Sequence, residues 1–329
     1  MNVIRVLTSA SCLVAIAATA CSRASSAADD HTAHMSAADV AAPNANGGSG
    51  QGIAGLPASN INAAARVKDS PRHAEWVKVA WEPGSSDSLM AWVVYPSTSS
   101  AKSPVVVVVH EIFGLSTWVR GVADQVAAEG FIAIAPDLVS RVRGGPSTDE
   151  LSSDSARKII QGVSSAERNK GVIAVAKYAM SQPSAAQKYG VIGYCWGGAT
   201  VFMHAVNGGA PGFGGGVAFY GLPYMVGGGQ GGPPATPNAD SLAKIRMPVM
   251  LLNGSKDARI ATAMPAVDSV MKALGKKYSA QNYEGAVHGF LRAQDDPKAT
   301  RDPVEEAANL AATKDAWPRT VSFLKQNLK

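Results

Sequence analysis

Residues 75–81 alternate between apolar and polar side chains, and residues 89–95 form a second short apolar segment. A period of two places successive side chains on opposite faces of a strand, so we expect both segments to be β-strands. Between them, Glu82, Pro83 and Gly84 have the composition of a turn. The pattern therefore predicts an antiparallel hairpin at the start of the folded region.

Residues 105–109 are a continuous run of valine. Such a run indicates a strand buried on both faces, as in a parallel sheet. Helical and strand patterns then alternate to the end of the chain, which predicts an α/β fold with a doubly wound, mostly parallel sheet flanked by helices. The expected helices are 117–129, one or two within 155–180, 261–274 and 304–328, and the expected strands are 131–135, one centred on Val191, 216–220, 249–252 and 278–283. Residues 208–237 are rich in Gly and Pro and should contain a long loop.

The amino-terminal region has a different composition. Residues 6–20 are almost all apolar or small and follow a basic residue, which is typical of a secretory signal, assigned here to residues 1–21. Residues 18–21 (ATAC) resemble a bacterial lipoprotein processing site, at which Cys21 would be lipidated and would tether the protein to a membrane; plain cleavage near Ala27 is the alternative. Residues 22–62 are rich in Ala, Ser, Gly and Asn and are expected to be a flexible tether.

This organisation leaves residues 63–329 as one catalytic domain. We expect the protein to be exported, and to be either periplasmic or lipid-anchored to a bacterial envelope membrane.

The overall composition excludes some function classes. Hydrophobic residues make up 46% of the chain and charged residues 17%, and the net charge is +5, as in an ordinary globular protein. No basic stripe with interleaved aromatic residues is present, so nucleic acid is not an expected partner. Two of the three cysteines, Cys12 and Cys21, belong to the signal. The remaining one, Cys195, cannot form an internal disulfide in an exported domain, which favours a chemical role.

Cys195 stands at the centre of residues 193–197, which read GYCWG between a strand-like and a helix-like segment. Strand, sharp turn and helix are the context of a nucleophile elbow. In such a turn the central residue is strained, with φ above zero, and the flanking positions have no room for a Cβ. The side chain then lies above the amino end of the next helix, where unpaired N–H groups favour a thiolate. A small buried thiol in a tight turn is the alternative interpretation.

Two later residues could complete a catalytic triad. Asp257 lies in a Gly-containing loop after the strand at 249–252, and His288 lies in a loop after the strand at 278–283. Taken alone, Asp257 could cap a helix and His288 could be an ordinary loop histidine. The order of nucleophile, acid and histidine behind an elbow favours a Cys195–Asp257–His288 triad. The scattered histidines have no metal-ligand spacing, so neither a metal nor an organic cofactor is expected.

An elbow nucleophile also requires an oxyanion hole with two backbone donors. The first should be the N–H of Trp196, the residue after the nucleophile. We assign the second to Ile112, in the loop that follows the valine strand. His110, which ends that strand, is expected to be structural.

Four motifs in this order resemble the dienelactone hydrolase family: residues 110–115 (HEIFGL), 135–138 (APDL), 193–198 (GYCWGG) and 287–290 (VHGF). The resemblance extends from about Trp76 to the carboxyl terminus. It implies an α/β-hydrolase fold with a Cys-Asp-His triad that opens unsaturated lactones bearing a carboxylate. Family members with this activity are mostly small cytoplasmic enzymes, whereas this chain adds an export signal, a tether and a glycine-rich loop.

The resemblance also implies roles for residues around the triad. Glu111 would contact the resting thiol and swing away when substrate binds, since a nearby carboxylate keeps a thiol protonated. Arg141 and Arg292 match positions that bind the substrate carboxylate, for which the planar guanidinium is suited. Tyr220 would line the pocket.

Our leading hypothesis is therefore a thiol hydrolase acting on a small lactone or ester, expected to be anionic, through a thioester. A broad-specificity exported esterase or peptidase with the same triad is one alternative. A non-catalytic binding protein of the same fold is another, because fold alone does not fix function. Acylation of Cys195 by an activated ester would exclude the binding protein, and a preference for anionic lactones would exclude the general esterase.

Overall fold

The computed structural model describes residues 50, 52–97, 102–149, 151–227 and 234–329. The expected signal at residues 1–21, the possible lipidation site at Cys21 and most of the expected tether lie outside the described residues. Within the described residues, no helix combines the length and the apolar character needed to cross a membrane.

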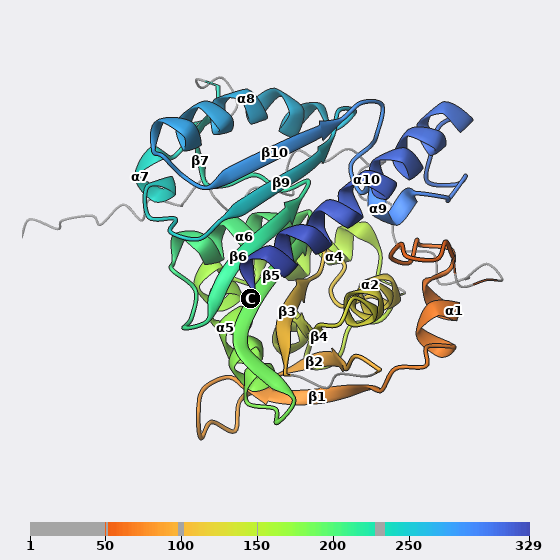
Figure 1. The fold of residues 1–329 in the computed structure, drawn as a ribbon, viewed down its shortest axis with the longest axis vertical. Helices are drawn as coiled ribbons and strands as arrows, with labels where there is room; N and C mark the ends of the chain where they lie inside the picture. The colour runs from red at the N-terminus through yellow and green to blue at the C-terminus, as the bar shows by residue number, and fades with distance from the viewer. Residues whose placement is uncertain (1–49, 51, 98–101, 150, 228–233) are drawn as a thin grey trace, which may run out of the picture.

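An eight-stranded sheet forms the centre of the fold, with strand order β1-β2-β4-β3-β5-β6-β9-β10 (Figure 1). The pairs β1/β2 and β2/β4 are antiparallel, and all other pairs are parallel. The expected doubly wound, mostly parallel sheet is confirmed, and the expected hairpin forms its antiparallel edge. The strands are β1 (Ala74–Ala80), β2 (Ser88–Val94), β3 (Ser103–Val109), β4 (Ile132–Asp137), β5 (Ala185–Tyr194), β6 (Phe213–Phe219), β9 (Val249–Gly254) and β10 (Tyr278–Tyr283).

Helices cover both faces of the sheet. In Figure 1, α10 crosses in front of β5 and β6, and α6 lies behind them. The helices are α1 (Ala63–Lys68), α2 (Thr117–Ala128), α3 (Ser140–Arg143), α4 (Ser153–Gln161), α5 (Ser165–Met180), α6 (Trp196–Val206), α7 (Ala239–Leu242), α8 (Ala258–Ala273), α9 (Phe290–Ala293) and α10 (Pro303–Asn327). The sequence pattern did not predict the short helices α1, α3, α7 and α9. A small two-stranded sheet, β7 (Met225–Val226) with β8 (Thr236–Pro237), lies within the expected Gly- and Pro-rich loop.

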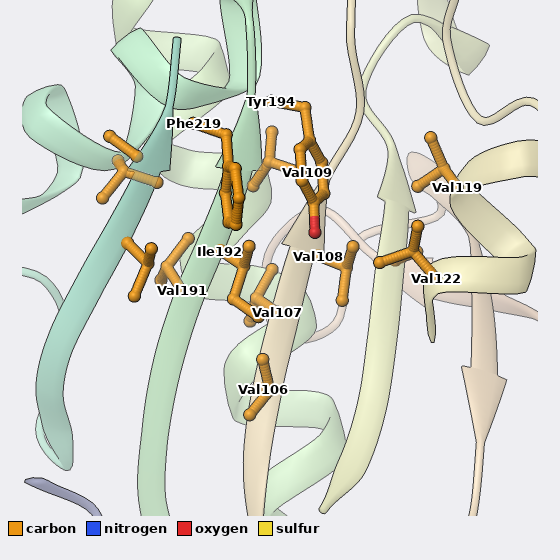
Figure 2. Close-up of a cluster of buried hydrophobic side chains, with 14 of the residues drawn as sticks. Val106, Val107, Val108, Val109, Val119, Val122, Val191, Ile192, Tyr194 and Phe219 are labelled. Carbon is orange, nitrogen blue, oxygen red and sulfur yellow. The ribbon is translucent and has the colours of Figure 1, made fainter. Parts of the chain in front are cut away.

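The valine run of β3 lies at the centre of the core. Val105 to Val109 are fully buried, and Figure 2 shows Val106 to Val109 between the side chains of β5 and of α2. Because side chains of a strand alternate between faces, a run without polar residues can be buried only where both faces are covered. β3 and β5 are parallel neighbours, so their carboxyl ends meet at one edge of the sheet. His110 and Cys195 follow these two ends directly.

Beyond β5, the chain turns so tightly that backbone packs on backbone. A Cβ at Gly197 would lie 2.4 Å from the carbonyl oxygen of Val109 and 2.6 Å from that of His110. A Cβ at Gly193 would lie 2.0 Å from the carbonyl oxygen of Gly197. Only glycine can occupy these positions, and α6 therefore begins directly against the end of β3.

Residues 56–62, here called the amino-terminal strap, pack against the body of the domain. The carbonyl oxygen of Ala58 accepts a hydrogen bond of 2.8 Å from the indole Nε1 of Trp118, and the backbone N–H of Asn60 donates one of 2.8 Å to the carbonyl oxygen of Arg292. The packed chain thus begins before the expected start of the catalytic domain. The strap is held by hydrogen bonds more than by large apolar side chains, so its composition resembled that of a flexible tether.

The close backbone contact predicts that Gly197→Ala is strongly destabilising. We expect a loss of about 3 kcal/mol in the free energy of unfolding, at the upper end for overpacking, because the obstructing carbonyls belong to the central sheet. The measurement is urea unfolding followed by circular dichroism. Gly145→Ala is the matched control, since a Cβ there meets nothing within 4 Å, and its stability should equal that of the wild type. Equal stability of both variants would show that the elbow relaxes freely.

Candidate active site

Cys195 occupies the turn between β5 and α6. Its backbone has φ 56° and ψ −114°, the positive φ that the elbow motif predicts. Its backbone N–H donates to the carbonyl oxygen of Phe219 at 3.0 Å, which ties the turn to the end of β6. The residue is the N-cap of α6 and is 5% exposed. The thiol therefore lies at the positive end of a helix, in a largely dry environment.

Asp257 and His288 come together at the carboxyl ends of β9 and β10. The Nδ1 atom of His288 lies 2.6 Å from Oδ2 of Asp257, and both side chains are buried. The other carboxylate oxygen, Oδ1, accepts a hydrogen bond of 3.3 Å from the N–H of Ile260 at the start of α8. Asp257 is thus both the helix cap and the partner of the histidine, so the two interpretations from the sequence are compatible.

The charges and hydrogen bonds of these residues shift the pKa values of Asp257 and His288. Burial alone would raise the pKa of Asp257, but the hydrogen bond and charge of His288 hold that pKa below its usual value. Burial alone would lower the pKa of His288, but the charge of Cys195 and the hydrogen bond and charge of Asp257 raise it to about 10. The cationic imidazolium is therefore the favoured form of His288 beside a thiolate. These three side chains interact as a unit.

Tyr220 lies against this unit. It is one of two described non-glycine residues with positive φ, the other being Cys195. Its ring centroid is 4.8 Å from that of His288, and its backbone N–H donates to the carbonyl oxygen of Leu252 at 2.7 Å. Tyr220 is fully buried and packs on His288; its expected place in the lining of a substrate pocket stays a prediction.

The two expected oxyanion donors belong to the elbow and to the loop after β3. Trp196 is the first residue of α6, where a backbone N–H has no acceptor within the helix. Ile112 is buried in the loop after β3, and among the described residues its N–H makes no hydrogen bond to another backbone group. Among the described residues neither N–H donates to a backbone carbonyl, and their role as oxyanion donors stays a prediction.

Glu111 and Arg292 form a buried ion pair next to the triad. The Nε atom of Arg292 lies 3.1 Å from Oε2 of Glu111, and both side chains are almost completely buried. Burial raises the pKa of Tyr220, and the charges of Glu111 and Cys195 raise it further. All three groups are therefore close together. Glu111 thus lies close to Cys195 and Tyr220, and its ionic partner is one of the two expected substrate-binding arginines. Its expected contact with the resting thiol stays a prediction.

Arg141 lies in a different cluster. Its guanidinium pairs with both carboxylate oxygens of Asp87, with one bond of 3.1 Å from Nε, and lies 3.3 Å from Oε1 of Glu167. It also stacks over the ring of Trp81, with 4.1 Å from Cζ to the ring centroid. None of these partners belongs to the triad. The structure therefore places Arg292 beside Glu111 and Tyr220 but leaves Arg141 engaged by two carboxylates.

Two residues of the site were not singled out from the sequence. The hydroxyl of Tyr194 is buried without a hydrogen-bond partner among the described residues, and burial and the charge of Glu111 raise its pKa far above the usual value. The guanidinium of Arg168 lies over the ring of Trp196, 4.9 Å from the centroid. Tyr194 is inside the GYCWG motif and could have been noticed there; no sequence signal linked Arg168 to it.

The described residues contain no group of three or more His, Cys, Asp or Glu side chains that could hold a metal ion. Cys195, His288 and Asp257 supply a thiol, an imidazole and a carboxylate that interact with one another.

Comparison with known proteins agrees with this architecture. The family model of the dienelactone hydrolase family matches residues 89–328. A Salmonella typhimurium protein provisionally named carboxymethylenebutenolidase is 27% identical over 245 residues, which cover 74% of this chain and 85% of that protein. A Synechocystis protein with the same provisional name is 30% identical over 234 residues, which cover 69% of this chain and 87% of that protein.

Solved structures show the same fold. A Klebsiella pneumoniae protein provisionally named dienelactone hydrolase matches with a TM-score of 0.61 and 24% identity, over 77% of this chain and 99% of that one. The residues matched by the family model run from β2 to the end of α10 and include the loop after β3, the elbow and His288. This chain therefore belongs to the dienelactone hydrolase family and is a hydrolase with the α/β-hydrolase fold.

Proposed function

We propose that this protein hydrolyses a small lactone or ester that carries a carboxylate, with Cys195 as nucleophile and a thioester intermediate. One observation carries the proposal: Asp257 holds a buried His288 through a 2.6 Å hydrogen bond, and Cys195 acts on the ionisation of the same imidazole. A buried imidazolium between a carboxylate and a thiol is the arrangement that activates a cysteine nucleophile.

In the proposed first step, the thiolate of Cys195 attacks the carbonyl carbon and forms a tetrahedral intermediate. The N–H groups of Ile112 and Trp196 stabilise its oxyanion. The ring C–O bond then breaks, the leaving oxygen takes a proton from His288, and the acyl group remains on sulfur as a thioester. In the second step, water attacks the thioester while His288 accepts its proton. The C–S bond breaks, the carboxylic acid product leaves the regenerated thiolate beside a protonated His288, and the acid loses its remaining proton to solvent.

Arg292 is the first proposed ligand of the substrate carboxylate. Removing one partner from a buried ion pair costs about 3–5 kcal/mol, because it leaves an uncompensated charge. An incoming carboxylate supplies that compensation, so Glu111 can leave Arg292 without a net loss of pairing. We propose that this exchange couples substrate binding to a movement of Glu111 away from the nucleophile.

Arg141 is the second proposed carboxylate ligand. Its side chain is 28% exposed, so an anion from solvent can reach it and compete with Asp87. Arg141 is connected to the elbow through α5. It pairs with Glu167 of that helix, and the next residue of the helix, Arg168, stacks on Trp196.

The same contacts favour one alternative function. Both arginines are already paired with carboxylates of the protein, so a neutral ester could bind without displacing either pair. A broad-specificity esterase with the same triad is therefore the second candidate.

We also propose that the enzyme acts outside the cytoplasm, either free in the periplasm or tethered through Cys21. The support is the sequence of residues 1–21 alone.

Replacing the nucleophile should abolish turnover without unfolding the protein. Cys195→Ala removes a single sulfur atom and leaves the strained backbone conformation occupied by a residue with the same Cβ, so the fold should persist. We expect hydrolysis of both a carboxylate-bearing enol lactone and a neutral p-nitrophenyl ester to fall to background in steady-state assays. Unchanged circular dichroism is the control, and residual activity near that of the wild type would refute the proposed nucleophile.

The pKa of His288 predicts a distinct pH dependence. Its folded value of about 10 exceeds the ordinary 6.5, so the charged imidazolium should stabilise the fold fully below pH 6.5. This stabilisation should be lost as the pH rises toward 10. Cys195→Ala and Asp257→Asn each remove a negative charge beside the ring and should lower the pKa. NMR titration of ¹⁵N-labelled histidine, with His288→Gln for assignment, measures it. An ordinary value near 6.5 in the wild type would contradict the coupling.

Arg141 can be tested through substrate preference. Arg141→Ala should raise the KM for the anionic enol lactone about tenfold, equivalent to about 1.4 kcal/mol, and leave the neutral ester unchanged. Arg141→Lys is the matched variant, because it keeps the charge but loses the planar fork, and it should recover only part of the affinity. Equal kinetics of all three proteins on both substrates would favour the general esterase.

A further inference from the structure

His110, which the sequence analysis treated as structural, makes an unusual set of contacts. It follows β3 directly and is fully buried. Its Nδ1 atom lies 2.6 Å from the carbonyl oxygen of Glu111, and its Nε2 atom lies 3.1 Å from the backbone nitrogen of Leu138. Its ring stacks on that of Trp196, with centroids 5.4 Å apart and an interplanar angle of 15°. One imidazole therefore contacts the loop after β3, the loop after β4 and the elbow.

These contacts fix the tautomer of His110. A backbone N–H can only donate, so Nε2 must accept from Leu138. A carbonyl oxygen can only accept, so Nδ1 must carry the proton that is donated to Glu111. Burial also lowers the pKa of His110, which agrees with a neutral ring that has one donor and one acceptor.

The bond to Glu111 has a consequence for the next residue. The carbonyl of Glu111 and the N–H of Ile112 belong to the same peptide group, which is planar and trans, because the described residues contain no cis peptide bond. In a trans peptide these two groups point in opposite directions. A hydrogen bond that holds the carbonyl of Glu111 therefore also sets the direction of the Ile112 N–H.

We propose that His110 is a positioning residue for the oxyanion hole: its Nδ1–H aims the N–H of Ile112, and its ring supports Trp196, which carries the other donor. This inference rests on the proposed function, because Ile112 and Trp196 are the donors of that mechanism. His110 touches no reacting atom and acts through the peptide that it orients. Preorganised donors contribute to catalysis because they need no reorganisation during the reaction.

The same ring joins the oxyanion loop to the substrate-binding side. Leu138 follows β4 and precedes α3, which carries Arg141. The hydrogen bond from Leu138 to His110 holds this loop against the loop of Ile112. Carbonyl activation and carboxylate binding thus share one buried support.

Side-chain geometry allows the two hydrogen bonds to be tested separately. The amide of Asn is attached at Cγ, as is Nδ1 of histidine, so His110→Asn can keep the donor to Glu111. The amide of Gln lies one bond further out, as does Nε2, so His110→Gln can keep only the acceptor for Leu138. Each variant loses one hydrogen bond and the ring stacking, so their stabilities should be similar.

The experiment compares kcat and KM of wild type, His110→Ala, His110→Gln and His110→Asn on the neutral p-nitrophenyl ester, with urea unfolding of each. We expect kcat to fall about 100-fold in the Ala and Gln variants, the effect of losing one oxyanion donor, while KM changes less than about threefold. The kcat of His110→Asn should be at least about tenfold higher than that of His110→Ala or His110→Gln. A folded His110→Asn that is as slow as His110→Gln would overturn the inference, as would unchanged kcat in all three variants.

Two further measurements keep the result unambiguous. ¹⁵N NMR of the wild-type histidines should show the His110 proton on Nδ1, and a proton on Nε2 would overturn the inference even if a variant does not fold. Cys195→Ala is assayed in parallel. If it is inactive while the His110 variants behave alike, only the positioning role is wrong; if it is active, the proposed function itself is wrong.

Discussion

Backbone contact between the end of β3 and the start of α6 is the constraint on which the site depends. Gly197 lies so close to the carbonyl groups of Val109 and His110 that no side chain fits between them. This contact fixes the distance between the loop after β3 and the elbow without relying on side-chain rotamers. Cys195 and the loop that carries Ile112 are therefore positioned relative to each other by the central sheet.

Around this rigid frame, the charged groups of the site are arranged as mutually dependent pairs. Asp257 pairs with His288, and Glu111 pairs with Arg292, all with almost no exposure to solvent. A buried charge is tolerated only while its partner is present. The hydroxyls of Tyr194 and Tyr220 have no hydrogen-bond partners among the described residues and are held neutral beside Glu111. The site thus contains polar groups that a substrate could satisfy.

The sequence predicted those features that depend on local pattern. The sheet, its leading hairpin and the strand at residues 278–283 follow from periodicity and turn residues, and the strained conformation of Cys195 follows from the glycines beside it. The features that could not be predicted depend on which residues, distant in the sequence, form ion pairs and hydrogen bonds with one another. An arginine such as Arg141 can pair with any nearby carboxylate, and the sequence does not say that Asp87, 54 positions away, is the one. The hydrogen bonds of His110 likewise connect loops that only the folded sheet brings together.

The amino-terminal strap changes what counts as the folding unit of this protein. The family model matches this chain from residue 89, yet the indole of Trp118 donates to the carbonyl oxygen of Ala58, and Asn60 donates to that of Arg292. A chain cut at the family boundary would lose β1, expose the indole of Trp118 and leave its N–H without this acceptor. It would also remove the hydrogen bond from Asn60 to the carbonyl oxygen of Arg292 in α9. The packed chain is therefore larger than the region that the family model matches, and the strap attaches to α2 and α9 from outside that region.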